Sequence, residues 1–520
     1  MSVKYGELCS ILILENFGNV AQKIHDELQW GPLTFKLILS AVGLPAGLVK
    51  RALCILIQYG FVTFEPGNNP DIAEYKLLQE KIVLLLRYPK YLTLIKYKRG
   101  EPSMLLVEEV LRHGSITATK AILQTWKRIQ QGAIATYTDG ISGLKEFFHQ
   151  LIINQYLICC PSPNTESGAN EECRVPHLLI NENDLFSPPD INLQKLMELE
   201  RGNSTDDPGD GGILWRCNFD RFHQDLRDEI MVEAVRRRFD NEAAALMEII
   251  LQLMYERTDA WASSSNPVPF TSIRENLEKK KWPQLSQFLD QYLKVLEEDS
   301  SNFIRRSGEG TTSSVFVNLT VAFHNITSAA IENVVEHRFG CKAARIFRLV
   351  KQKRYIDQEQ LQKLAMIPDK EAKQLTYRLL QESFLHVHEL KKPVSSGPNK
   401  SFYLLHIDFK QVAQVVLNMC YKGVYNTLIR AKHEKVNNFR LIEKFEKLNT
   451  IAKNMREQGD DENLIKQLLN EWMTPPEKGL LESVEAMVEK LRMAELYVDD
   501  TIFLIHLFTY YDAAHLRDKP

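Results

Sequence analysis

Three histidines form the only group in this sequence whose spacing suits a metal ion. His386 and His388 alternate along a stretch with strand periodicity, so their side chains point to one face, and His406 lies on the strand expected to return beside it. Zinc binds imidazole nitrogens, but a structural zinc centre needs a fourth ligand and supporting hydrogen bonds, and the sequence offers no clear candidate for either. A solvent-exposed hairpin with interchangeable polar residues is the simpler interpretation. We predict neither a metal nor a cofactor.

Basic side chains are concentrated just before these histidines. Residues 341–380 contain ten Lys or Arg and four Asp or Glu, whereas the whole chain of 520 residues has a formal charge of −3. Such a run indicates either an ordinary solvated helix surface or a surface that binds nucleic acid or an acidic partner, because clustered cations attract phosphates and carboxylates. The sequence leaves these two interpretations open.

Motifs for catalysis are missing from the chain. It contains no GxxxxGK(S/T) phosphate loop, no GxGxxG after a strand, no HExxH and no GxSxG. Adjacent carboxylates such as Glu108 and Glu109 point in different directions on a helix and are typical surface acids. We therefore predict a chain without catalytic residues.

The elements around the basic run predict a winged helix. Apolar residues recur at helical spacing over 344–350, 361–365 and 372–380, and Pro368 suits the first turn of the third helix. Two stretches with strand periodicity, 384–388 and 402–407, then flank a turn-rich tip. Three helices followed by a hairpin form a winged helix, a variant of the helix-turn-helix that places its third helix against nucleic acid.

The same order of patterns recurs along the chain, more loosely in the second copy. The sequence therefore predicts a mainly α fold with small β-hairpin wings, in which four tandem winged helices precede a helical coiled-coil stalk. The predicted boundaries are 1–80, 81–160, 219–325 and 326–407 for the winged helices, 161–218 for a flexible linker or insertion rich in Gly, Pro and polar residues, and 408–520 for the stalk and a C-terminal docking segment.

Basic residues on third helices and wings are the candidates for contacts with DNA phosphates. Each of them can equally be a solvated structural charge. The candidates are Lys50 and Arg51 in the first module, Arg305 and Arg306 beside the third wing, and Lys370, Lys373 and Arg378 in the last module.

The tail after Asp408 has apolar residues at steps of three and four, which predicts long antiparallel helices. Its end, VDDTIFLIHLF, is densely apolar. Core packing is the default interpretation of this segment, and the alternative is a surface that docks on a partner, with Ile502, Phe503, Ile505 and Phe508 as candidates.

Overall composition is that of an ordinary globular protein, with 44% apolar and 25% charged residues. No apolar run is long enough to cross a bilayer. Eight scattered cysteines without a CxxC pair favour a reducing compartment over a disulfide framework or a zinc ribbon. We expect an intracellular protein that makes no membrane contact.

Several stretches resemble one family. Residues 342–390, the SFYLLHID strand, the CYKGVYNTLIRA helix, the LLRYPKY segment and the VDDTIFLIHLF end resemble the winged-helix subunit of eukaryotic DNA-directed RNA polymerase III, which is distantly similar to the alpha subunit of TFIIE. The resemblance covers nearly the whole chain in order and is strongest from residue 341 onward. The zinc ribbon of the TFIIE type is missing here, which favours the polymerase subunit.

The resemblance implies a nuclear, non-catalytic subunit that belongs to a detachable heterotrimer. Such a subunit supports promoter recruitment, DNA opening and transcription initiation of small untranslated RNAs, including tRNA and 5S rRNA. The implied partners are the polymerase III core at the clamp of its largest subunit, two other heterotrimer subunits, the initiation factor TFIIIB, and double- and single-stranded promoter DNA.

Two other functions compete with this one. A free-standing winged-helix regulator would read promoter sequence directly, but the isoelectric point of 6.5 predicts weak binding to DNA alone, because affinity depends on neutralising phosphates. An assembly scaffold of the cullin or proteasome-lid kind normally places long helical repeats before a single winged helix. Here the winged modules come first and recur.

Overall fold

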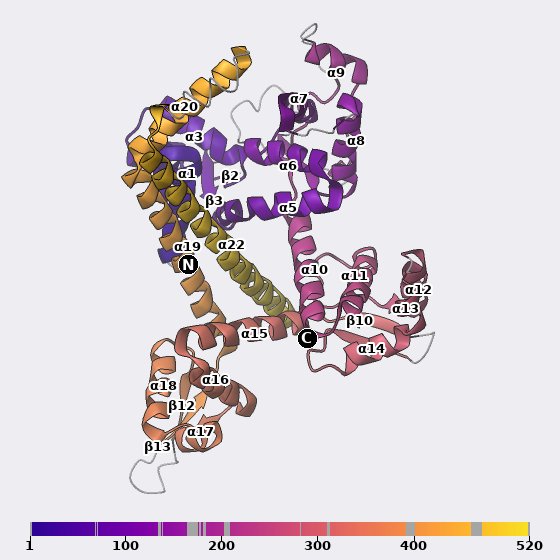
Figure 1. The fold of residues 1–520 in the computed structure, drawn as a ribbon, viewed down its shortest axis with the longest axis vertical. Helices are drawn as coiled ribbons and strands as arrows, with labels where there is room; N and C mark the ends of the chain where they lie inside the picture. The colour runs from indigo at the N-terminus through magenta and orange to yellow at the C-terminus, as the bar shows by residue number, and fades with distance from the viewer. Residues whose placement is uncertain are drawn as a thin grey trace. The chain divides into compact units, whose positions relative to one another are not determined.

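The computed structural model describes residues 3–67, 69, 71–133, 137, 139–163, 175, 178–179, 184–201, 208–280, 282–308, 313–391, 401–458 and 471–517. The chain divides into two compact units, Met1–Asp225 and Leu226–Pro520. Helices dominate both units and small antiparallel sheets accompany them, as the sequence predicts (Figure 1).

The first unit begins with helices that pack on a three-stranded sheet. Strand β3 lies between β1 and β2, and Val62 pairs with Leu77 in the predicted hairpin. The helix α3 buries Val49, Leu53 and Leu56 at steps of three and four, which gives it one inward face. These elements are α1 (Val3–Leu28), β1 (Leu33–Thr34), α2 (Phe35–Val42), α3 (Ala46–Gln58), β2 (Val62–Pro66) and β3 (Ala73–Leu77).

The rest of the first unit is a helical layer with two short sheets. Its elements are α4 (Gln79–Val83), η1 (Leu84–Arg87), α5 (Tyr88–Arg99), α6 (Glu101–His113), α7 (Ala118–Arg128), η2 (Ile129–Ala133), α8 (Gly140–Ile153), β4 (Leu157–Cys159), β5 (Ser162–Pro163), β6 (Leu178–Leu179), α9 (Leu193–Glu200) and β7 (Trp215–Cys217). Helix α10 (Phe219–Arg238) follows and continues into the second unit.

The end of the segment predicted as a linker, 161–218, is built into this layer. Strand β7 pairs with β4, with Leu157 opposite Cys217. Asp210 is buried and its carboxylate accepts hydrogen bonds from the backbone N–H and the hydroxyl of Thr119, at 2.6 and 2.7 Å. A carboxylate at the start of a helix satisfies an unpaired N–H, so Asp210 caps α7. No role could be predicted for Asp210 from the sequence, because Thr119 lies 91 positions away along the chain.

The second unit contains two further sheets with the same strand order as the first. In each of them the last strand lies in the middle, in the orders β8-β10-β9 and β11-β13-β12. The predicted wing hairpins are confirmed, with Ile304 opposite Val317 and His386 opposite His406. The elements are α11 (Asn241–Tyr255), β8 (Val268–Pro269), α12 (Phe270–Lys279), α13 (Pro283–Gln287), α14 (Leu289–Glu298), β9 (Ile304–Ser307), β10 (Ser314–Val317), α15 (Leu319–Phe339), α16 (Cys341–Lys353), β11 (Ile356–Asp357), α17 (Gln358–Ala365), α18 (Asp369–Gln381), β12 (His386–Lys391) and β13 (Ser401–His406).

Three long helices complete the second unit: α19 (Phe409–Asn437), α20 (Phe439–Gln458) and α22 (Pro475–Arg517). Helix α22 runs antiparallel to the other two, because Lys410 forms an ion pair with Asp512 while Lys444 bonds to Glu477. Its last turns and α15 share a core with α10, α11 and β10. Helix α15 runs through the boundary predicted at 325/326, so the chain has no break there.

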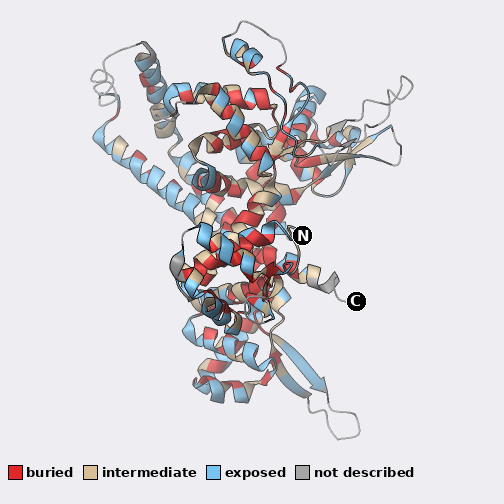
Figure 2. Cartoon of the chain, turned by 90° about the vertical axis from the view of Figure 1, so that its right-hand side faces the viewer, coloured by how far each residue is buried: buried red, intermediate tan, exposed pale blue. Residues whose placement is uncertain are grey.

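The buried residues lie mainly on the faces by which helices and strands pack against one another. Figure 2 shows exposed residues along the hairpin of β12 and β13. Within the described part of the chain, no single helix is both long and apolar enough to cross a membrane. The bent pair α2 and α3 meets both criteria only when its helices are taken together.

Candidate nucleic-acid and partner interfaces

Four of the ten basic residues of the basic run form ion pairs with described residues: Lys342, Arg348, Lys351 and Lys373. Arg348 bonds to Glu332 and Glu336 at 3.1 and 3.0 Å, and Lys351 bonds to Glu332 at 2.7 Å. The hydrogen bond to Glu332 raises the pKa of Arg348. Both glutamates lie on α15, outside the stretch in which the charges were counted. Two acids from outside the counted stretch therefore reduce the excess of positive charge from six to four.

Two of the three candidate cations on α18 remain available. Lys373 pairs with Asp369 at 3.0 Å, whereas Lys370 and Arg378 are exposed and form no ion pair with any described residue. The guanidinium of Arg378 lies 5.5 Å from the centre of the Phe339 ring. The surface of α18 is thus polar and basic.

Sequence reasoning missed two neighbours of Lys370 on that surface. Gln374 and Tyr377 follow it at i+4 and i+7, which places all three on one stripe of α18. The side chain of Tyr377 is 69% exposed. The helical spacing of these residues is visible in the sequence, but neither Gln374 nor Tyr377 carries the charge that marked the other candidates.

The two arginines beside the third wing have different roles. Arg305 is exposed and has no ion pair with a described residue. The side chain of Arg306 is only 9% exposed and pairs with Asp290 at 2.7 Å, while donating to the Ser313 hydroxyl at 3.3 Å. Arg306 therefore ties β9 to α14, and its proposed contact with DNA is not supported.

The candidate cations of the first module lie among apolar side chains. Lys50 and Arg51 are exposed on α3, and the Lys50 Nζ lies 5.8 Å from the centre of the Phe35 ring. Leu48 and Ile55 are also exposed on α3, at 44% and 42%. This helix presents an apolar surface with two cations, unlike α18.

The three histidines of the last wing do come together. The ring centres of His386 and His388 lie 5.8 and 6.2 Å from that of His406, and Tyr355 lies 5.5 Å from His406. Burial lowers the pKa of His406, and the neighbouring His386 and His388 add to this effect. No group of His, Cys, Asp or Glu among the described residues has the arrangement of a metal site. The rings pack against one another as an aromatic cluster.

The four candidates for docking on a partner are core residues. Ile502, Phe503, Ile505 and Phe508 are all buried within the chain, because the end of α22 packs against α15 and α19. The ring centre of Phe508 lies 5.4 Å from that of Phe409. The docking interpretation of these residues is corrected to the default one, core packing.

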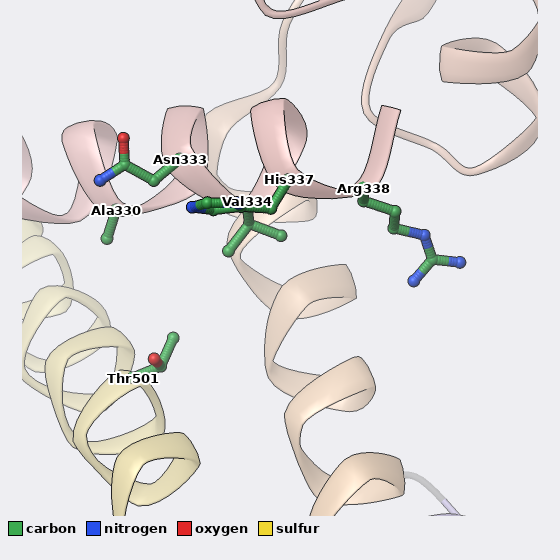
Figure 3. A pocket seen from close by; sticks show the side chains of 6 residues that line it. All are labelled: Ala330, Asn333, Val334, His337, Arg338 and Thr501. Atoms are coloured by element: carbon green, nitrogen blue, oxygen red, sulfur yellow. The ribbon is translucent and has the colours of Figure 1, made fainter. Parts of the chain in front are cut away.

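A shallow groove of about 500 Å³ lies between α15 and α22 (Figure 3). Its lining is mostly apolar or uncharged, and Arg338 at one end is held by Glu382 at 2.9 Å. The groove is open to solvent. Its lining residues are Ala330, Asn333, Val334, His337, Arg338 and Thr501.

Comparison with family models finds matches to four segments of the chain. Family models match at 331–407 (POLR3C, C-terminal winged-helix domain), 181–326 (RNA polymerase III subunit RPC82), 440–504 (DNA-directed RNA polymerase III subunit RPC3, helical hairpin domain) and 7–66 (RNA polymerase III subunit RPC82 helix-turn-helix domain). The first match confirms the winged helix predicted around the basic run.

Curated relatives named DNA-directed RNA polymerase III subunit RPC3 align over nearly the full length. The relative from Homo sapiens is 32% identical and the alignment covers 96% of this chain and 97% of the relative. The relative from Danio rerio is 30% identical over 98% of each chain. A more distant relative from Dictyostelium discoideum is 19% identical over 81% of this chain and 90% of its own length.

Proposed function

We infer that this chain, which belongs to the family of DNA-directed RNA polymerase III subunit RPC3, is a non-catalytic subunit of nuclear RNA polymerase III. The observation that carries the proposal is the extent of the likeness. It spans 96% of the chain, so it covers the helical hairpin as well as the winged helices. A shared single domain would support only a shared fold.

The architecture we propose is four tandem winged helices followed by a coiled-coil stalk. Three sheets with the same strand order support three of these modules. The second module would use the pair β4 and β7 as its sheet. The antiparallel packing of α22 on α19 and α20 supports the stalk.

The mechanism we propose is positioning by binding energy. The chain joins two other subunits in a heterotrimer, rests on the clamp of the largest polymerase subunit, and helps TFIIIB recruit the enzyme to promoters of small untranslated RNAs such as tRNA and 5S rRNA. Duplex or opened promoter DNA would pass the second unit. The geometry favours Arg305, Lys370 and Arg378 as phosphate contacts, because they are exposed and pair with no described carboxylate.

The experiment that tests the proposal is affinity purification of the tagged full-length chain from nuclear extract at moderate salt, followed by mass spectrometry. We expect the RNA polymerase III core and two further subunits in constant ratio. Recovery of the chain alone would support a free-standing regulator, and recovery with a proteasome-lid or cullin assembly would support a scaffold. Either result would overturn the polymerase assignment.

A further inference from the structure

The helix pair α2 and α3 is apolar on its outer as well as its inner face. The inner face buries Ile38, Val49 and Leu53 in the core of the module. On the outer face, Leu37, Leu48 and Ile55 are exposed, at 54%, 44% and 42%. Helices that are apolar all round are normally buried, and this pair is apolar enough as a whole to resemble a bent membrane span in composition.

The outer face is unobstructed at Gly47, and the Ser40 hydroxyl there is already hydrogen-bonded. A methyl group added at Gly47 would meet no atom within 4 Å, so another chain can approach the backbone there. The Ser40 hydroxyl donates a 2.9 Å hydrogen bond to the Leu37 carbonyl of its own helix, so it does not need water. Such a surface loses little solvation when a partner covers it.

The charges around this face have one sign. Residues 35–58 contain three cations, Lys36, Lys50 and Arg51, and no Asp or Glu. None of the three cations forms an ion pair with a described residue. A partner that fits the face has an apolar stripe with carboxylates beside it.

We propose that the outer face of α2 and α3, defined by Leu37, Leu48 and Ile55, binds an amphipathic helix of another protein chain whose apolar stripe is flanked by acidic residues. Duplex DNA fits the face less well, because leucine and isoleucine offer base edges no hydrogen bonds and two helix cations neutralise few phosphates. Leu48 and Ile55 lie seven residues apart on α3, so they share one side of that helix. An amphipathic helix that packs there would contribute its own apolar anchors at i, i+3 or i+4 and i+7.

The test uses the full-length tagged chain with a photo-crosslinking benzoylphenylalanine at position 55, purified with its co-assembled chains. A matched control carries the same group at position 153, because Ile153 is 66% exposed on α8, outside the face. We expect position 55 to attach to a helix-forming, acid-flanked segment of another chain, and position 153 not to do so. Attachment to this chain's own helices, to a second copy, to lipid or to nucleic acid would overturn the proposal.

Substitutions then measure the contribution of the face. Leu48→Glu with Ile55→Glu should lower recovery of the crosslinked partner at least about tenfold. The two new carboxylates would replace apolar contacts at the centre of the interface and would lie beside the acidic residues of the partner. Ile153→Glu should leave recovery unchanged. Unaltered hydrogen exchange of the α3 amides, read by mass spectrometry, would show that α3 still folds, as expected for exposed positions.

The inference rests on the proposed function only in that the partner is sought within the polymerase assembly. If wild-type chain recovers no polymerase subunit, the proposed function fails. If it recovers them and position 55 attaches to no other protein chain, the function stands and the docking face is wrong.

Discussion

The third helices of the first and last modules, α3 and α18, are alike inside and different outside. Each buries small and branched residues against its own module, with Leu53 and Leu379 at the centre. The outer surface of α3 exposes Leu48 and Ile55, whereas that of α18 exposes Lys370, Gln374 and Tyr377. The inner residues are similar and the outer residues are not, so shared topology alone does not tell which modules meet DNA.

The turn between the second and third helices differs in the same way. In the first module Gly43 has a left-handed backbone with φ of 66°. In the last module Met366 holds the corresponding position with φ of 54°, and its side chain is 86% exposed. A non-glycine residue in this region is strained, and the last module tolerates that strain while displaying a large apolar side chain.

The largest effect is expected from substitutions that test whether the inner faces of α3 and α18 contribute equally to stability. Leu53→Ala and Leu379→Ala should each destabilise their own module by about 2–5 kcal/mol, because a buried leucine is replaced by a cavity. Hydrogen exchange of the α3 and α18 amides, read by mass spectrometry, measures each module separately. The control Leu48→Ala, on the outer surface of α3, should change protection by no more than about 0.5 kcal/mol. An equal loss in the control would show that the outer face is packed within the chain.

The outer faces of α3 and α18 can be compared by how each affects the salt dependence of affinity for duplex DNA. Removing charge with Lys370→Gln and Arg378→Gln should flatten the slope of log affinity for duplex DNA against log salt by about 0.9 for each phosphate that the protein no longer neutralises. Lys50→Gln with Arg51→Gln should leave the slope unchanged. Fluorescence anisotropy of the purified chain measures both.

A control for net charge uses cations that already have carboxylate partners. Lys342→Gln with Arg348→Gln removes two charges from the last module, but Lys342 pairs with Glu371 and Arg348 with Glu332. This variant should keep the wild-type slope. If α3 proved to be the salt-sensitive helix, the assignment of the two faces would be reversed.

Exchanging the turn residues tests the backbone difference. Gly43→Met should destabilise the first module by about 1 kcal/mol, because a side chain is disfavoured at positive φ and the gain from a stiffer unfolded chain offsets only part of that cost. Met366→Gly should stabilise the last module by up to about 1 kcal/mol, for the converse reason. Calorimetry of the full chain measures both, and Met366→Ala should show no gain, since it retains the β-carbon.

The smallest expected effect concerns the neutralised cations of the last module. Glu332→Gln removes the carboxylate shared by Arg348 and Lys351, both of which are about half exposed. Stability should fall by no more than about 1 kcal/mol, because exposed ion pairs contribute little. Affinity for duplex DNA should rise slightly, since Lys351 loses its carboxylate partner while Arg348 keeps its pair with Glu336. An unchanged affinity would place this side of α16 away from DNA.

The element pattern of the last module could be predicted because its signals are local. Helical spacing, Pro368 and strand alternation all lie within a few residues of the elements they specify. The free positive charge of the module could not be predicted in this way. Glu332 and Glu336 lie on α15, which passes through a predicted boundary and ends before the stretch in which the charges were counted. A count along the chain therefore overestimated the free positive charge.

Whether the C-terminal segment is buried could not be decided from the sequence, for a related reason. The run around Ile502 and Phe508 is apolar enough for a core or for an interface, and only the helices that cover it decide between them. The buried Arg227 shows the same limit. It donates to Tyr511 at 3.1 Å across 284 positions of sequence, and no local pattern marks either residue.

The pairing of β4 with β7 has a consequence for how this protein tolerates change in length. The two strands bring residues 157–159 beside 215–217, and Asp210 fixes the chain a few residues earlier. The described part of the interval includes β5, β6 and α9, and Leu196 of α9 is buried. The entropy of closing a loop grows only with the logarithm of its length, so doubling the number of residues between two fixed points costs roughly 0.6 kcal/mol. An insertion in this interval that leaves β5, β6 and α9 intact should therefore carry little thermodynamic cost, whether it arises by evolution or is made by an experimenter who needs a tag or a fluorophore on the assembled enzyme.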